Sequence, residues 1–131
     1  MISPRALIIE DDKDAAELYR HVLEPLGFET ETLRTGEAAL ARLAVIVPAV
    51  VLLDLHLASR KSGTDVLHQI RADQRLAETR VIVISGHPEL AETIGDEADV
   101  VLIKPVDVRT LSDLVKRFYP RDSVQLNASR M

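Results

Sequence analysis

Apolar runs of strand length alternate along this chain with segments in which apolar residues recur at helical spacing. The runs occupy residues 6–9, 29–33, 49–53, 80–84 and 100–103, and a helical segment follows each of them. Such alternation is typical of βαβ units that build a parallel sheet. Most of the runs are continuously apolar, as expected of strands covered on both faces, whereas 29–33 is polar and resembles an edge strand. We therefore expect an α/β fold with five parallel strands.

Residues that favour helix ends support this segmentation. Thr35 and Asp107 precede two of the helical segments and can cap them. Gly27 stands where the first helix should end, and a short fourth helix should begin near Pro88 and finish at Gly95.

Length and charge limit the classes of protein to consider. At 131 residues the chain can form one domain, which we expect over residues 5–119, followed by a polar tail or linker at 120–131. A net charge of -5 disfavours direct binding to nucleic acid. The longest apolar stretch, Leu43 to Leu53, is broken by Pro48 and falls short of the roughly 20 residues that span a membrane. The absence of Cys fits a cytoplasmic protein.

Candidate site residues stand at the ends of the first, third, fourth and fifth expected strands. Glu10 and Asp11 follow the first strand, Asp54 the third, Ser85 the fourth and Lys104 the fifth. Because ligands of open parallel sheets bind beyond the carboxyl ends of the strands, we expect these side chains to share one crevice. Carboxylates that meet there repel one another unless a cation lies among them, and oxygen ligands suit Mg²⁺.

An aspartate beside such a cation can accept a phosphoryl group, since phosphoryl transfer is catalysed mainly by positioning and charge neutralisation. Asp54 is the candidate acceptor, and Lys104 with the Ser85 hydroxyl is suited to hold phosphoryl oxygens. Asp12 and Asp14 are expected only to cap a helix or to face solvent.

Four segments in this order resemble the signature segments of response-regulator receiver domains of two-component systems. They are residues 8–12, 51–55, 83–86 and 104–105, and the similarity extends from about residue 6 to residue 118. The resemblance implies a flavodoxin-like, doubly wound sheet of strand order 2-1-3-4-5. It also implies that Asp54 is phosphorylated by a histidine kinase or a phosphotransfer protein.

The resemblance further implies roles for the residues around Asp54. Asp11 would bind Mg²⁺ directly, Glu10 would act through water, and the backbone carbonyl of His56 would be a further ligand. Small Gly86 would leave the phosphoryl pocket open, and the peptide bond between Lys104 and Pro105 would be cis. The chain would then be a signalling switch that catalyses only its own phosphotransfer and dephosphorylation, and not an enzyme in the usual sense.

Some positions depart from the family pattern. Val101 stands where most relatives carry Tyr or Phe, which puts the usual output mechanism in doubt. His56 and His87 occupy positions that flank the path of the hydrolytic water in receivers. The apolar segment 45–47 precedes Pro48 where relatives often carry polar residues; we expect core packing there, with a small exposed patch as the alternative.

Other classes of function stay open. The chain could be a pseudo-receiver that only binds proteins, although the acid pair, Asp54 and Lys104 speak against it. A metal-dependent phosphatase on a similar sheet generally needs a second Asp two residues after the nucleophile, where this chain has His56. The sequence does not identify the kinase or the output protein, and it leaves open both homodimer formation and whether the chain is a stand-alone regulator.

Overall fold

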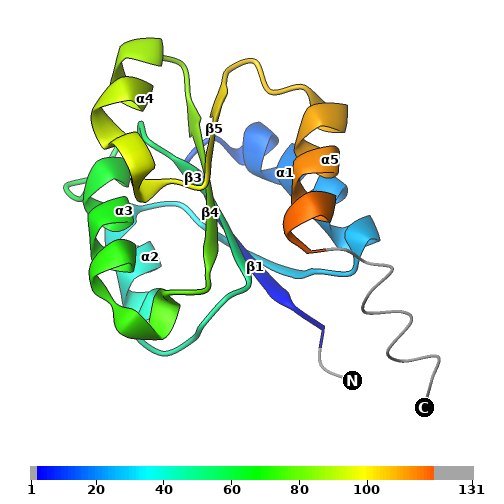
Figure 1. The fold of residues 1–131 in the computed structure, drawn as a ribbon, viewed down its shortest axis with the longest axis horizontal. Coiled ribbons are helices and arrows are strands. Elements are labelled where there is room, and N and C mark those ends of the chain that lie inside the picture. The colour runs from blue at the N-terminus through cyan, green and yellow to red at the C-terminus, as the bar shows by residue number, and fades with distance from the viewer. Residues whose placement is uncertain (1–2, 120–131) are drawn as a thin grey trace.

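Five parallel strands form a single sheet of order β2-β1-β3-β4-β5 in the computed structural model, which describes residues 3–119. This is the predicted flavodoxin-like order, with β3 at the centre (Figure 1). The strands are β1 (Arg5–Ile9), β2 (Glu29–Leu33), β3 (Val50–Asp54), β4 (Arg80–Ser85) and β5 (Val100–Ile103).

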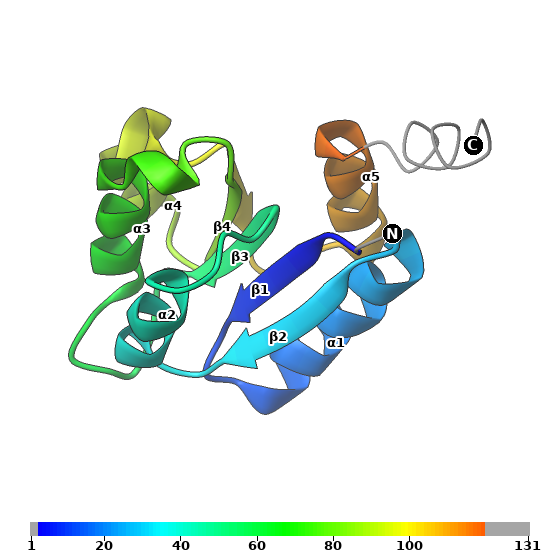
Figure 2. The same cartoon turned by 90° about the horizontal axis from the view of Figure 1, so that it is seen from below.

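Helices cover both faces of the sheet. Two of them, α1 and α5, lie on one face, and α2, α3 and α4 lie on the other (Figures 1 and 2). Their bounds are α1 (Lys13–Leu23), α2 (Gly36–Leu43), α3 (Gly63–Ala72), α4 (Pro88–Ile94) and α5 (Val108–Phe118). Short 3₁₀ turns follow α1, α3 and α4 at Glu24–Leu26, Gln74–Leu76 and Gly95–Glu97.

Side-chain caps explain where several helices begin. The Asp12 carboxylate accepts from two backbone amides of α1, so this residue caps a helix as expected. Thr35 accepts from Ala38 N at the start of α2, and Asp107 accepts from Thr110 N at the start of α5. The cap predictions are therefore confirmed.

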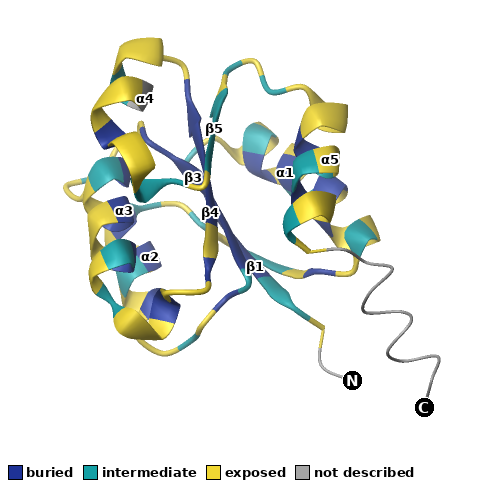
Figure 3. Ribbon diagram, in the orientation of Figure 1, coloured by how far each residue is buried: buried dark blue, intermediate teal, exposed yellow. Residues whose placement is uncertain are grey.

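The core consists of two apolar layers, one on each side of the sheet. Strand β3 is buried along its whole length and β1 is buried from Ala6 onward, whereas β2 has only exposed or half-buried residues (Figure 3). The other edge strand, β5, also has no buried residue, but its sequence is apolar, so edge position permits the polar sequence of β2 without requiring it.

The prediction of core packing at residues 45–47 is only partly confirmed. Ile46 packs against the core, but Val45 and Val47 are 70% and 56% exposed. These residues follow the last turn of α2 in an irregular segment, where no helical or strand period fixes the direction of a side chain. The expected tail at 120–131 lies outside the described residues.

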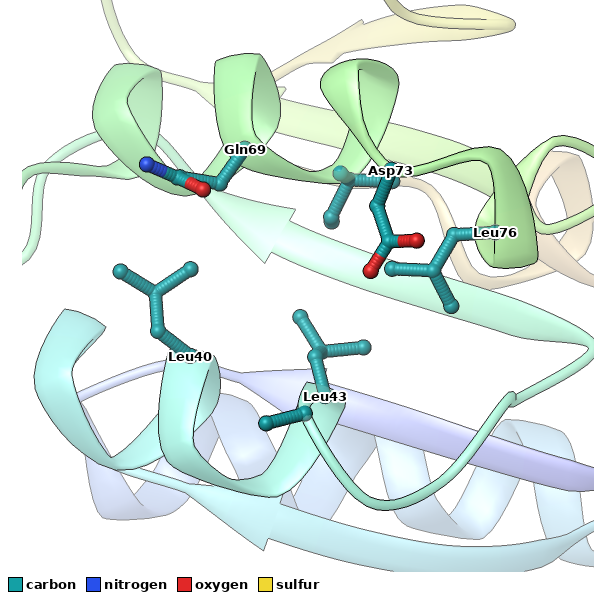
Figure 4. A pocket seen from close by; sticks show the side chains of 7 residues that line it. Leu40, Leu43, Gln69, Asp73 and Leu76 are labelled. Carbon is teal, nitrogen blue, oxygen red and sulfur yellow. The ribbon is translucent and has the colours of Figure 1, made fainter.

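A cavity of about 270 Å³ separates the carboxyl-terminal turns of α2 and α3 (Figure 4). Leu40, Leu43 and Leu76 contribute apolar surface, and Asp73 and Gln69 contribute polar groups. This cavity contains none of the residues predicted to form the site. Within residues 3–119, no helix is both long and apolar enough to cross a membrane.

Candidate acidic site at the carboxyl edge of the sheet

The parallel sheet brings the predicted residues to one edge. Asp54 and Ser85 are the last residues of β3 and β4, Glu10 directly follows β1, and Lys104 directly follows β5. Carboxylate oxygens of Glu10, Asp11 and Asp54 all lie within 4.8 Å of one another. The expected convergence of three carboxylates in one crevice is thus present.

Glu10 is the most deeply buried of the three acids, with 1% of its surface exposed. Its Oε2 accepts from Asp12 N at 3.2 Å, while its Oε1 is buried without a hydrogen bond in the described part of the chain. Burial, reinforced by the neighbouring Asp54, raises the pKa of Glu10 to about 8. A buried carboxylate oxygen without a hydrogen bond is energetically unfavourable, and a bound cation would compensate for the missing hydrogen bond.

Asp54 is 3% exposed and is held through both carboxylate oxygens. Its Oδ1 accepts from His56 N at 2.8 Å, and its Oδ2 accepts from Lys104 Nζ at 3.2 Å. The Lys104 ammonium also lies 3.6 Å from Glu10 Oε1. Partial burial of Lys104 lowers its pKa, but the two carboxylates outweigh that effect, so its pKa is raised overall. Lys104 therefore stays charged and offsets part of the acidic charge.

Asp11 and Ser85 connect the crevice to neighbouring loops. Asp11 Oδ2 accepts from Ala58 N at 2.9 Å, which ties the β3–α3 loop to the end of β1. The buried Ser85 hydroxyl accepts from His87 N at 3.0 Å and donates to His87 O at 3.2 Å. In this structure the hydroxyl thus holds the β4–α4 loop.

The remaining expectations drawn from the resemblance concern backbone groups. The peptide bond between Lys104 and Pro105 is cis, as expected. A Cβ added to Gly86 would meet no atom within 4 Å, which agrees with an open pocket. No hydrogen bond within residues 3–119 occupies the His56 carbonyl oxygen, so this oxygen stays free as a metal ligand.

These residues fit a divalent cation. The donor set consists of oxygen atoms, it carries more negative than positive charge, and it contains one buried oxygen, Glu10 Oε1, without a hydrogen bond. A cavity of about 250 Å³ between α1 and the end of β2 reaches Glu10, and Lys13, Thr32 and Arg34 also line it. The crevice therefore satisfies the chemical requirement for Mg²⁺ that the sequence predicted.

Two features of the site were not foreseen from the sequence. The β3–α3 loop is anchored to α2, because Ser59 Oγ accepts from Gly36 N and Glu37 Oε1 accepts from Lys61 N. The rings of His56 and His87 also lie in contact, 4.3 Å apart between their centres. The matching positions of these histidines, each two residues after the polar end of a strand, were the only signal in the sequence.

Two regulatory proteins are similar to this chain in sequence. The chain is 36% identical to the sensory transduction protein RegX3 of Mycobacterium tuberculosis over 80% of this chain and 46% of RegX3. It is 32% identical to the regulatory protein LuxO of Vibrio vulnificus over 79% of this chain and 23% of LuxO. The chain thus spans less than half of the length of these relatives.

Two solved structures resemble the fold of this chain over most of its length. A receiver domain from Methylobacillus flagellatus, described as CheY-like, matches with a TM-score of 0.79 and 29% identity, covering 89% of this chain and 99% of that one. The receiver domain of a LuxO repressor protein from Vibrio parahaemolyticus matches with a TM-score of 0.81 and 27% identity, covering 97% and 98%.

One family accounts for the fold and for these similarities. The family model for the response regulator receiver domain matches residues 6–116, which includes all five strands apart from Arg5 and almost all of α5. The chain therefore belongs to the response regulator receiver domain family of two-component signalling systems.

Proposed function

We propose that this chain is an active phosphoacceptor and that Asp54 receives the phosphoryl group. The observation that carries the proposal is the cluster of three carboxylates within 4.8 Å, in which Glu10 Oε1 is buried without a hydrogen bond. Burying carboxylates side by side destabilises a fold, so the arrangement is best explained by the use of a cation. The phosphoryl donor is a histidine kinase or a phosphotransfer protein.

Glu10, Asp11 and Asp54, together with the His56 carbonyl oxygen, would hold Mg²⁺. When bound, the ion neutralises charge on the acids and on the transferred phosphoryl group. Glu10 and Asp11 are the positioning acids, and Asp54 is the acid of the cluster that accepts a hydrogen bond from the Lys104 ammonium, at 3.2 Å.

In the transfer, an Asp54 carboxylate oxygen attacks the phosphorus atom of a phosphohistidine. The new P–O bond forms as the P–N bond breaks, and the imidazole of the donor leaves with the electron pair. Lys104, now 3.2 Å from Asp54 Oδ2, binds the phosphoryl oxygens that arrive there. Ser85 exchanges its hydrogen bonds to His87 for one to the phosphoryl group, which moves the β4–α4 loop.

The competing proposal is a pseudo-receiver that binds proteins without being phosphorylated. Such a module needs neither the buried acid cluster nor the Lys104 ammonium between Glu10 and Asp54. Both are retained here, so we favour the active switch. The output partner of the switch is a protein, since the net charge of -5 is unsuited to direct contact with nucleic acid, and the expected location is the cytoplasm.

Exposure to a small acyl phosphate with Mg²⁺, followed by intact-mass spectrometry, tests the proposal. We expect one phosphoryl adduct in the native chain and none in Asp54→Asn or when Mg²⁺ is removed by a chelator. Asp12→Asn is the matched control, because Asn also caps helices well and Asp12 only caps α1. A native chain that gains no adduct while it binds Mg²⁺ would favour the pseudo-receiver.

A further inference from the structure

Two imidazole rings meet at the mouth of the acidic site. His56 lies in the β3–α3 loop and His87 in the β4–α4 loop, and their ring centres are 4.3 Å apart with planes inclined at 55°. Both residues are exposed. Within the described part of the chain, the His56 ring has no hydrogen-bond partner, and the Nδ1 atom of His87 lies 3.5 Å from Glu89 Oε1.

We propose that His56 and His87 together bind a Zn²⁺ ion at a site separate from the acid cluster. Imidazole nitrogen is a preferred ligand of Zn²⁺, whereas Mg²⁺ prefers oxygen. Zn–N bonds of about 2.0–2.1 Å place the centres of two imidazoles on one tetrahedral ion roughly 5 Å apart. The observed 4.3 Å is close to that separation, so small rotations of two exposed rings would complete the geometry.

The backbone on each side of the pair is already fixed, which lowers the entropy lost when an ion binds. His56 N donates to Asp54 Oδ1 at 2.8 Å, and His87 exchanges hydrogen bonds with the Ser85 hydroxyl through both its N and its O. Glu89, on the first turn of α4, has a carboxylate oxygen 3.5 Å from His87 Nδ1, and it becomes a third ligand if the exposed side chains turn towards one ion, since the three groups do not yet lie within 4.8 Å of one another.

A bound Zn²⁺ ion would connect the loop that follows Asp54 to the loop that follows Ser85. This consequence rests on the proposed function: the connection hinders movement of Ser85 towards a phosphoryl group and restricts the approach of water to it. We therefore expect Zn²⁺ to slow both the gain and the loss of the Asp54 adduct. The binding itself requires no phosphorylation, so the two proposals can fail independently.

Isothermal titration with Zn²⁺ in a large excess of Mg²⁺ tests the site, because the excess keeps the acid cluster filled. We expect one Zn²⁺ per chain. The affinity should fall by at least about tenfold in both His56→Ala and His87→Ala, since even the loss of a group that only hydrogen-bonds to a metal ligand lowers metal affinity by about 10–100-fold. His68→Ala is the matched control, because His68 is also an exposed histidine beside a carboxylate, 2.6 Å from Glu97, but lies on α3.

Asp54→Asn separates this site from the acid cluster. The proposal predicts that Asp54→Asn and His68→Ala bind Zn²⁺ with native affinity, and that the imidazole ¹⁵N resonances of His56 and His87 shift together on titration. Unchanged affinity in both His56→Ala and His87→Ala overturns the proposal. So does affinity that is lost only in Asp54→Asn, because the ion would then lie in the acid cluster.

Discussion

Replacing Glu10 with Gln should stabilise the metal-free protein at alkaline pH while weakening its binding of Mg²⁺. Glu10 ionises near pH 8 in the folded protein, against a usual value of 4.5 in an unfolded chain. Below about pH 4.5 the carboxyl group is neutral in both states and its charge has no effect on stability. As the pH rises towards 8 the unfolded chain releases this proton and the folded chain retains it, so the free energy of unfolding falls.

The size of the effect follows from the separation of the two pKa values. At about 1.36 kcal/mol per pH unit, ionising Glu10 in the folded protein costs at most about 5 kcal/mol above pH 8. A neutral amide removes the charge but stays buried, and its NH₂ group can donate to Asp54. We therefore expect Glu10→Gln to recover about 1–3 kcal/mol of this cost.

Urea unfolding with a chelator present, near pH 5 and near pH 9, measures the difference. The variant should exceed the native chain in stability near pH 9, and the gap should shrink near pH 5. Added Mg²⁺ should stabilise the native chain, by about 2.7 kcal/mol at a hundred times its dissociation constant, and should stabilise the variant less. A variant that is no more stable than the native chain near pH 9 would refute the reasoning from the burial of Glu10 and from the lack of a hydrogen bond at its Oε1.

Two further predictions concern the loops around the site. Gly63→Ala should destabilise the fold by about 1–3 kcal/mol, because the new Cβ would lie 2.3 Å from Asp54 O. Gly86→Ala is the control: its Cβ would meet no atom within 4 Å, so its stability in the same urea titration should equal that of the native chain. Beryllofluoride with Mg²⁺ should alter hydrogen exchange mainly between Ser85 and Gly95. The Val101 methyl groups should change little, because a half-buried, β-branched side chain has few rotamers. A large change at Val101 without any change in hydrogen exchange at 85–95 would contradict this prediction.

The convergence of the site residues could be predicted because a parallel sheet brings the ends of its strands together. Every strand of such a sheet ends at the same edge, so polar residues at strand ends must converge there, as Glu10, Asp54 and Lys104 do. The helix caps at Asp12 and Asp107 could also be predicted, since they depend on contacts between residues that are close in sequence.

Contacts between distant loops could not be predicted. The hydrogen bond from Ala58 N to Asp11 and the contact between the His56 and His87 rings join segments that no periodicity relates. The deep burial of Glu10 beside Lys104 likewise depends on how the loops close over the sheet. Core packing was expected wrongly for Val45, because apolar character alone does not determine which way a side chain points in an irregular segment.

Chemical trapping of the phosphorylated residue tests the assignment of the acceptor. Borohydride reduces an aspartyl phosphate to homoserine and leaves free carboxylates intact, so peptide mapping after treatment with an acyl phosphate and Mg²⁺ locates the modified residue. The account predicts homoserine at position 54 in the native chain, and none in a chain treated without Mg²⁺. Homoserine at position 11, or at any position other than 54, would contradict it.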